Sequence, residues 1–353
     1  MTTFGGGERH LADLSQALSD LKHEVYAASV PGSPLAAELS FLTEGRMLAL
    51  SPRNYLKNLT ALAAFVRAHD IEIVHVHAAR DYHLGAMAVR LASRGRLVLT
   101  RHTLFPLRRI NKQLLKNAGR VIAVSEAVAE SLRHNGVIES SKITVVHNGI
   151  DIDRFERAVA LGGDVPVLVG TVGHLAPIKG QDVFVRAAAL ISARRPEVRF
   201  IVIGEDKSPQ MGHRRSLESL IAELGLKEIV TMPGWQHDMP SALSSLSLFV
   251  SAARSEPFGL AIVEAMAAGL PIVAAASEGA LEILEDGITG KLVPVDDHHA
   301  LAQAVNELLE DPVECSRLAR NAQVAARERY SLKRMASDTE RVYHEVLATD
   351  LRG

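Results

Sequence analysis

The chain has 353 residues, of which 47% are hydrophobic and 23% charged, and its formal net charge is −2. This length favours two domains of a soluble globular protein, and no run approaches the 18 uninterrupted apolar residues that a transmembrane helix requires. The single cysteine, Cys315, excludes an internal disulfide and fits a reducing compartment. Residues 1–7 lack the basic and apolar regions of a signal peptide, so a cytoplasmic location is expected.

Strand-like and helix-like segments alternate along the first half, which favours an α/β fold with parallel sheets and crossover helices. Leu11, Leu14 and Leu18 recur at helical spacing directly after a glycine turn. Strands are then predicted at 24–29, 71–77, 96–100, 120–124 and 143–146, and helices at 52–69, 84–93 and 126–134. Ser125 is placed to cap the last of these helices.

A second α/β half follows a connector at 151–166, which contains Gly162, Gly163 and Pro166 and is the predicted hinge. Strands are predicted at 167–172, 199–203, 229–232, 248–251 and 271–275. Helices are predicted at 181–194, up to 224, and at 279–285, 297–310, 312–329 and 331–349. The predicted domains are therefore residues 1–150 and 167–330, with 331–353 as a separate C-terminal helix.

The start of the chain departs from this pattern. A doubly wound domain opens on a strand, yet only residues 1–4 precede the glycine turn. The first strand is central in the usual strand order. The sequence therefore predicts a first domain without its opening strand and with a gap in its sheet.

The stretch from Ser255 to Gly269 carries two carboxylates, Glu256 and Glu264, eight positions apart. Pro257 is predicted to be the first residue of a helix, because its fixed φ suits that position and its missing N–H is not needed there. The N–H groups of the first turn would then form an anion site. Phosphate at the helix end and two acids for hydroxyl groups predict a nucleotide-sugar site.

Two glycine-containing loops are further candidates for phosphate binding. Lys179 lies in the loop after the first strand of the second half, where open α/β sheets bind ligands. It is predicted to contact a diphosphate, the alternative being an ordinary surface lysine. Gly5, Gly6 and Gly7 allow close approach of a phosphate to the first helix, although a bare tight turn is equally consistent with them.

Three histidines follow or end predicted strands of the first half: His75, His77 and His102. Such a group can suggest zinc, but no third ligand with suitable spacing is visible, so no metal is predicted. We expect His75 to be a packed strand residue and His102 to line a cleft.

Residues 90–120 contain nine basic residues and no acidic one. Three interpretations remain: an ordinary solvated face, a patch for anionic lipid or a phosphorylated acceptor, and a nucleic-acid surface. The last is disfavoured because only Phe105 interleaves the charges. The predicted acceptor or membrane patch consists of Arg101, Arg108, Arg109 and Lys112.

In their order and spacing along nearly the whole chain, these motifs resemble the retaining glycosyltransferases of family 4, which have the GT-B fold. The resemblance rests on the glycine turn with Glu8, on Thr100-Arg101-His102, on Val124-Ser125 and on Asn148-Gly149-Ile150-Asp151. It continues through Pro177-Ile178-Lys179-Gly180 to Glu256 and Glu264, which match the family's E-x7-E motif.

The resemblance implies two Rossmann-like doubly wound domains that face each other across a cleft, with the last helix crossing back to the first domain. It implies catalytic roles for Glu256 at the transferred sugar, Lys179 at the leaving diphosphate and His102 near the reacting carbon. The implied donor-binding residues are Gly6, Gly7, His174, Gly204, Glu205, Gly234, Trp235, Phe258, Gly259, Leu260 and Glu264, with the ribose hydroxyls assigned to the last of these.

The expected reaction is transfer of a sugar from a nucleotide-diphosphate sugar to an acceptor hydroxyl, with retention of anomeric configuration and with no metal or cofactor. The basic stretch suggests a lipid-linked or cell-envelope glycan as acceptor and peripheral association with the inner face of an anionic membrane. Nucleic acid is not an expected partner. A nucleotide-sugar epimerase and a catalytically impaired nucleotide-sugar-binding subunit stay open as alternatives.

The chain departs from the family pattern at His174, where many members carry arginine. Histidine loses its charge near its ordinary pKa of about 6.5. We therefore predict that donor affinity weakens above neutral pH, as measured by titration calorimetry from pH 5.5 to 8.5. The variant His174→Arg should bind with little dependence on pH over this range, and a flat wild-type profile would contradict a charged role for His174.

Overall fold

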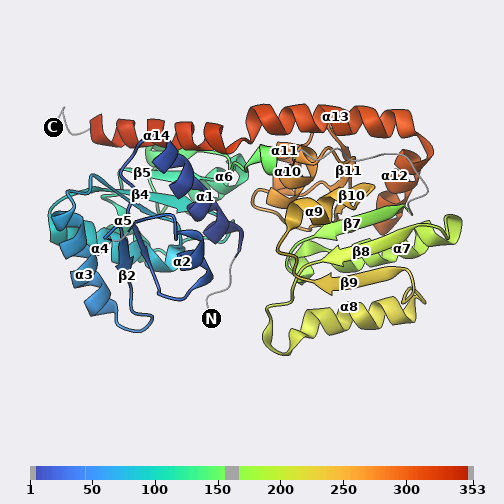
Figure 1. Ribbon diagram of the computed structural model, residues 1–353, viewed down its shortest axis with the longest axis horizontal. Helices are drawn as coiled ribbons and strands as arrows, with labels where there is room; N and C mark the ends of the chain where they lie inside the picture. The colour runs from blue at the N-terminus through green and yellow to red at the C-terminus, as the bar shows by residue number, and fades with distance from the viewer. Residues whose placement is uncertain (1–4, 44, 156–166, 349–353) are drawn as a thin grey trace. The chain divides into compact units, whose positions relative to one another are not determined.

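The computed structural model describes residues 5–43, 45–155 and 167–348, and the chain divides into two compact units (Figure 1). Met1–Gly149 and Leu332–Gly353 form the N-terminal unit, and Ile150–Ser331 form the C-terminal unit. Residues 1–4, to which the prediction of a missing strand refers, lie outside the described residues. So do residues 156–166 of the predicted hinge.

The N-terminal unit contains parallel strands in two sheets, one ordered β1-β2 and one ordered β3-β4-β5-β6. Its strands are β1 (Ala27–Ser29), β2 (Met47–Ala49), β3 (Ile73–Val76), β4 (Arg96–Arg101), β5 (Arg120–Ala123) and β6 (Ile143–Val145). Its α-helices are α1 (Gly6–Asp20), α2 (Pro34–Glu38), α3 (Tyr55–Ala68), α4 (Tyr82–Ala92), α5 (Asn111–Leu115), α6 (Glu126–Asn135) and α14 (Leu332–Ala348).

Helices α1 and α14 share a core with the four-stranded sheet of this unit. Leu14 and Leu18 of α1, Val98 and Ile122 of the sheet, and Met335 of α14 are buried in one cluster. Helices α3 and α4 pack against each other in a second cluster that includes Val74 of β3. Strand β4 is buried at every position after its first residue, as expected for a strand inside a sheet that is covered by helices.

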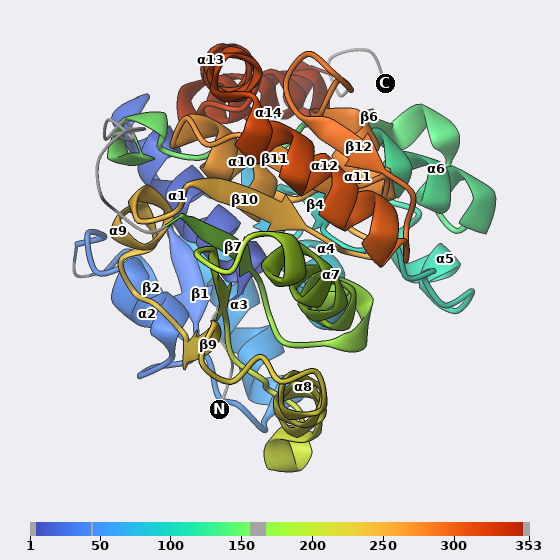
Figure 2. The same cartoon turned by 90° about the vertical axis from the view of Figure 1, so that its right-hand side faces the viewer.

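The C-terminal unit contains a single six-stranded parallel sheet in its described part. Its strands are β7 (Leu168–Val172), β8 (Arg199–Ile203), β9 (Val230–Gly234), β10 (Leu248–Ser251), β11 (Ile272–Ala275) and β12 (Lys291–Val293). Its α-helices are α7 (Gln181–Arg194), α8 (Gly212–Glu223), α9 (Met239–Ser244), α10 (Leu260–Ala267), α11 (Glu278–Ile283), α12 (His298–Glu310) and α13 (Pro312–Arg329). Helix α7 packs against both α8 and α12, and Figure 2 shows α7 beside β7.

The strand order of this sheet is β12-β11-β10-β7-β8-β9. Counted from β7 as the first strand, this is the 3-2-1-4-5-6 order of the Rossmann fold read from the other edge. The order reverses between β7 and β10, which are hydrogen-bonded neighbours. Loops that leave the carboxyl ends of these two strands diverge there, and such a switch point is where doubly wound sheets bind ligands.

Most predicted elements are confirmed, and several agree at both ends. Helices α7 and α13 and strands β8 and β10 begin and end at the predicted residues. The Ser125 side chain accepts a hydrogen bond of 3.1 Å from the N–H of Val128 and so caps α6. The short elements α2, β2, α5, α9 and β12 were not predicted.

The predicted helix start at Pro257 is wrong. Helix α10 begins at Leu260, after Gly259, whose φ is 114°. The carbonyl of Glu256 accepts a hydrogen bond of 2.9 Å from the N–H of Gly279 at the start of α11. This contact holds the segment before Gly259 against α11, and a proline signal read from local sequence does not detect it.

Gly180 and Gly225 both have left-handed backbones, with φ of 65° and 70°. A Cβ at Gly180 would lie 1.9 Å from the carbonyl oxygen of Ala252, whereas one at Gly225 would meet nothing within 4 Å. We predict that Gly225→Ala lowers the free energy of unfolding by ~1–2 kcal/mol from backbone strain alone. Gly180→Ala should lower it by ~2–5 kcal/mol because overlap adds to strain.

Denaturant unfolding of both variants provides the measurement. If Gly180→Ala and Gly225→Ala lose the same free energy of unfolding, the loop that contains Gly180 can move away from Ala252 at no cost in stability.

Candidate functional site

The loop after β7 carries Lys179 and is held by Arg254, which follows β10. The Arg254 guanidinium donates to both carboxylate oxygens of Asp182, at 2.9 and 2.7 Å, and its Nε lies 2.6 Å from Asp296. It also donates to the carbonyl of Pro177, and its backbone N–H donates to that of Ile178 at 2.9 Å. Paired charge-assisted bonds of this kind fix geometry as well as adding energy.

We call this set of bonds between Arg254, Asp182, Asp296 and the loop after β7 the Arg254 clamp. The sequence did not predict it, because there Arg254 is simply a charged residue after a strand. The clamp also changes the pKa of Asp182. Burial alone would raise the pKa of this carboxyl, but its hydrogen bonds and ion pair with Arg254 outweigh burial and hold the pKa below 3.8.

Lys179 and Glu256 form an ion pair at the switch point, with 26% and 17% of their side chains exposed. Lys179 comes from the loop after β7 and Glu256 from the loop after β10. The backbone N–H of Glu256 donates to the Glu278 carboxylate at 3.2 Å, which helps to fix the second loop. The structure therefore brings together the two residues predicted for diphosphate and sugar, and both keep a solvent-facing part.

Glu264, the second acid of the E-x7-E motif, lies inside α10 and is 7% exposed. Phe258 and Gly259, just before this helix, are buried, whereas Leu260 is half-buried. The Phe258 ring packs edge-on against Tyr330 at 5.7 Å. The two acids therefore occupy different environments, one partly solvated and one enclosed, although they lie eight residues apart in sequence.

The remaining predicted donor-binding residues of this unit lie at the ends of β7, β8 and β9. The N–H of Gly204 donates to the carbonyl of Gly234 at 3.0 Å, and the carbonyl of Glu205 accepts from Leu175 at 3.0 Å. A Cβ at Gly204 would lie 1.9 Å from the Gly173 carbonyl oxygen, so only glycine fits there. These bonds hold the three strand ends in register.

Trp235 provides an aromatic surface at the same edge of the sheet, with 38% of the residue exposed. The His174 ring stacks on it with a centroid separation of 6.3 Å and an interplanar angle of 18°. Lys207 lies over the indole at 5.7 Å from its centroid. An exposed indole flanked by cationic or titratable groups is suited to a nucleobase and its phosphates.

In the N-terminal unit, the glycine turn lies next to His102. A Cβ at Gly7 would be 3.8 Å from the His102 ring, and Gly6 is exposed at the start of α1. The Glu8 carboxylate accepts a hydrogen bond of 3.1 Å from the N–H of Gly5, which stabilises the beginning of the helix. The sequence placed these residues on separate elements, and the fold makes them neighbours.

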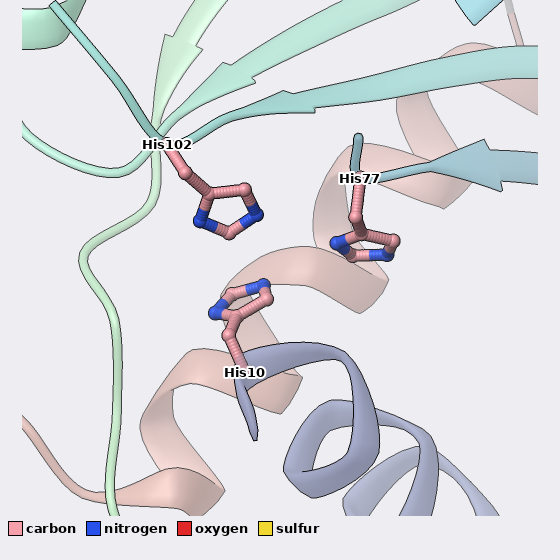
Figure 3. A group of neighbouring side chains, drawn as sticks. All are labelled: His10, His77 and His102. Carbon is pink, nitrogen blue, oxygen red and sulfur yellow. The ribbon is translucent and has the colours of Figure 1, made fainter. Parts of the chain in front are cut away.

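Three histidine rings converge at this place: His10 from α1, His77 after β3 and His102 after β4 (Figure 3). One ring nitrogen from each lies within 4.8 Å of the others. The sequence pattern did not indicate that His10 joins His77 and His102, so the third imidazole of this group was not predicted. The available signal was its position in the first turns of α1, on the buried side of the helix with Leu14.

Burial sets the protonation of this region. It lowers the pKa of His10 to about 4, with the Asn148 side chain opposing part of the shift. Burial, then the neighbouring rings, lowers the pKa of His77 and His102 well below 6.5, and that of His75 to about 3. His75 bonds Tyr343 at 2.6 Å and Thr100 at 2.7 Å through its two nitrogens, which confirms it as a packed strand residue.

One member of the predicted basic patch, Arg101, does not lie on the surface. Arg101 is 6% exposed and donates to the carbonyl of Phe105, so it is an internal residue. The error arose because Arg101 ends a strand and is covered by the following loop, which contains Phe105. Arg108, Arg109 and Lys112 are exposed, and between them Ile110 is 70% exposed. Phe105, in the preceding loop, is 72% exposed.

Comparison with protein families gives two matches that together cover residues 4–325. Residues 4–154 match Glycosyltransferase Family 4, and residues 153–325 match Glycosyl transferases group 1.

Curated relatives with the name D-inositol 3-phosphate glycosyltransferase include one from Mycobacterium sp. (strain KMS), 36% identical over 214 residues. That alignment covers 58% of this chain and 48% of the relative, so the chain spans about half the length of such relatives. The protein from Streptomyces coelicolor is 27% identical over 366 residues, which cover 87% of this chain and 80% of the relative.

Two solved structures are similar to this chain over nearly its full length. Anabaena Alr3699/HepE in complex with UDP and glucose has a TM-score of 0.83 and 27% identity, covering 96% of this chain and 95% of that one. A glycosyltransferase from Rickettsia africae ESF-5 has a TM-score of 0.85 and 23% identity, over 97% and 95% of the two chains. The latter similarity supports the fold, which is GT-B.

The Arg254 clamp leads to a stability prediction. Lysine cannot reproduce the guanidinium fork, so Arg254→Lys should lower the free energy of unfolding by ~1–3 kcal/mol at pH 7. Because the pKa of Asp182 is lowered on folding, the contribution of this pair is complete above pH 3.8 and is lost as the pH falls below it. The difference between wild type and variant should therefore shrink below about pH 4.

Denaturant unfolding at several pH values tests this prediction. Arg317→Lys is the matched control, because Arg317 also bonds both oxygens of a carboxylate, Glu314, but within one exposed helix. The free energy of unfolding of Arg317→Lys should fall by no more than ~1 kcal/mol. An equal fall in Arg254→Lys and Arg317→Lys would contradict a special role for the clamp.

Proposed function

Since this chain belongs to the family 4 glycosyltransferases, we propose that it transfers a sugar from a nucleotide-diphosphate sugar to an acceptor hydroxyl, with retention of anomeric configuration. The observation that carries this proposal is the Lys179–Glu256 ion pair at the switch point of the C-terminal sheet. A cation and a carboxylate held side by side match a donor that combines an anionic diphosphate with a sugar.

The proposed chemistry follows from where charge develops. Breaking the bond between the sugar carbon and the phosphate oxygen builds negative charge on the diphosphate and positive charge on the sugar. Lys179 stabilises the first and Glu256 the second, and both are preorganised by contacts to fixed loops. The enclosed carboxylate of Glu264 is assigned to the ribose hydroxyls.

The nucleobase is assigned to the exposed face of Trp235, with Gly204 and Gly234 allowing close approach of the donor to the strand ends. A similar structure contains UDP and glucose, so UDP is the first nucleotide to test. Gly6, Gly7 and His102 of the N-terminal unit keep the roles that the family resemblance gives them.

For the acceptor, we propose a phosphorylated or lipid-linked polyol or glycan. Relatives that carry inositol 3-phosphate in their names support a phosphorylated acceptor. We also propose that transfer requires no metal, because Lys179 and the start of α10 supply the positive potential at the diphosphate. Full activity in excess chelator is the corresponding observation.

Two other functions use the same site. A nucleotide-sugar epimerase would convert its donor without an acceptor, so incubation of the donor alone would produce an epimer. A binding subunit without catalysis would bind the donor and show no turnover with any acceptor. The matches to two glycosyltransferase family models over residues 4–154 and 153–325 favour a transferase over both.

The proposal predicts the effect of removing the lysine charge. Lys179→Met should lower kcat/KM by about 10²–10³-fold, the loss typical of one preorganised charge-stabilising group. Binding of UDP, measured by calorimetry, should weaken as well. Lys227→Met is the matched control, because Lys227 is an exposed lysine of the same unit. Unchanged UDP binding and turnover in Lys179→Met would refute the assigned site.

A membrane-facing role is proposed for the surface formed by Phe105, Arg108, Arg109, Ile110 and Lys112, the exposed loop–α5 surface. Its two apolar residues can enter the interfacial region while its cations attract anionic headgroups. None of the helices in the described ranges has the length and apolarity to cross a bilayer. Attachment through this surface would therefore be peripheral.

Charge reversal tests this surface. Arg108→Glu with Arg109→Glu should reduce sedimentation with phosphatidylserine vesicles by about tenfold or more, since each basic residue near the membrane contributes ~1 kcal/mol. Lys333→Glu with Arg341→Glu, on exposed positions of α14, makes the same change in net charge elsewhere. Equal loss in both double variants would show that net charge alone controls binding.

A further inference from the structure

The rings of His10, His77 and His102 form a cluster with an unusual shortage of hydrogen bonds. Both ring nitrogens of His10, Nδ1 of His77 and Nε2 of His102 are buried and have no hydrogen-bond partner of standard geometry in the described structure. Buried polar atoms left without a partner destabilise the folded state. Native proteins satisfy nearly all such atoms, so this cluster is organised around something that its own side chains do not supply.

The geometry of the cluster restricts what that ligand can be. Figure 3 shows the three rings facing one another, from α1 and from the segments after β3 and β4. One ring nitrogen from each residue lies within 4.8 Å of those from the other two. Tetrahedral zinc, with Zn–N bonds of about 2.0–2.1 Å, requires nitrogens about 3.3 Å apart. Metal binding would therefore require the ring nitrogens to approach one another by up to about 1.5 Å.

We propose that His10, His77 and His102 form a transition-metal site, with Zn²⁺ as its preferred ion and the fourth position open to water or a ligand hydroxyl. Three neutral imidazoles provide a set that suits zinc and neighbouring transition metals, whereas magnesium and calcium require oxygen ligands. An open fourth position is the feature that separates reactive zinc sites from closed structural ones.

The surroundings fit this assignment. Asn148 is buried next to His10, and its Oδ1 has no partner of its own. It can accept the N–H of the His10 nitrogen that does not bind metal, which is the usual way that protein sites orient a histidine ligand. His75 packs on His77 with ring centroids 4.1 Å apart, and its two hydrogen bonds anchor that ring from the other side.

The site carries a functional consequence that rests on the proposed transferase function. His102 is the residue that the family resemblance places at the reacting carbon, and a bound metal would occupy one of its ring nitrogens. Zinc binding should therefore inhibit transfer, while transfer itself proceeds in chelator. Metal availability would then regulate the enzyme through a residue that the reaction needs.

Metal binding is tested on the full chain by competition between the protein and a chromophoric Zn²⁺ chelator. We expect one tight site per chain, and binding of Co²⁺ should give the intense visible bands of tetrahedral coordination. His10→Ala and His77→Asn should each weaken zinc binding by at least about tenfold, because even changes behind the ligands have effects of that size. Mg²⁺ should not compete.

The control is His298→Asn with His299→Asn, which removes an adjacent histidine pair on α12, with ring centroids 4.3 Å apart. This variant should retain the tight site. Circular dichroism and the melting temperature of each variant, recorded without zinc, separate loss of ligands from loss of folding. His77→Asn tests the site independently if His10→Ala does not fold.

The outcomes are distinct. Zinc affinity that is unchanged in both His10→Ala and His77→Asn, or that disappears only in the α12 control, would overturn the proposal. Stabilisation by inorganic phosphate without any zinc binding would show that the rings serve an anion instead. Tight zinc binding by a chain that transfers no sugar would support the metal site and reject the proposed function.

Discussion

The geometry of the C-terminal unit depends on the reversal of strand order between β7 and β10. At this reversal, loops from two adjacent strand ends diverge, and ligands of doubly wound sheets bind there. One loop carries Lys179 and the other carries Glu256, and the ion pair between them follows from that topology. Arg254 then joins the two loops through Asp182 and the Pro177 carbonyl, so the position of the lysine is set by several bonds.

The N-terminal unit shows the converse situation, in which polar groups are buried without internal partners. Its histidines are enclosed by α1 and by the ends of β3 and β4, and burial keeps them neutral. Neutral imidazoles can accept or donate hydrogen bonds to sugar hydroxyls, and they can bind metal. The same low-dielectric environment therefore supports both the role proposed for His102 in transfer and the metal site proposed for the cluster.

Much of the fold was predictable because strand and helix periodicity is local, and α7, β8, β10 and α13 were found to the residue. The errors have a common cause, which is that they depend on contacts distant in sequence. Gly279 displaces the helix start from Pro257, Arg101 is covered by a neighbouring loop, and His10 meets His77 only after α1 folds onto the sheet edge. Arg254 was missed for the same reason, since its partners lie on other segments.

The central claim is that a nucleotide diphosphate binds the C-terminal unit at the carboxyl ends of β7 and β10. Hydrogen–deuterium exchange of the full chain with and without UDP tests this claim most directly, because it locates protection along the backbone. We predict slower exchange in residues 173–180 and 256–262, with little change in α8 and α13. Protection confined to other segments, or no protection at UDP concentrations that saturate binding, would contradict the account.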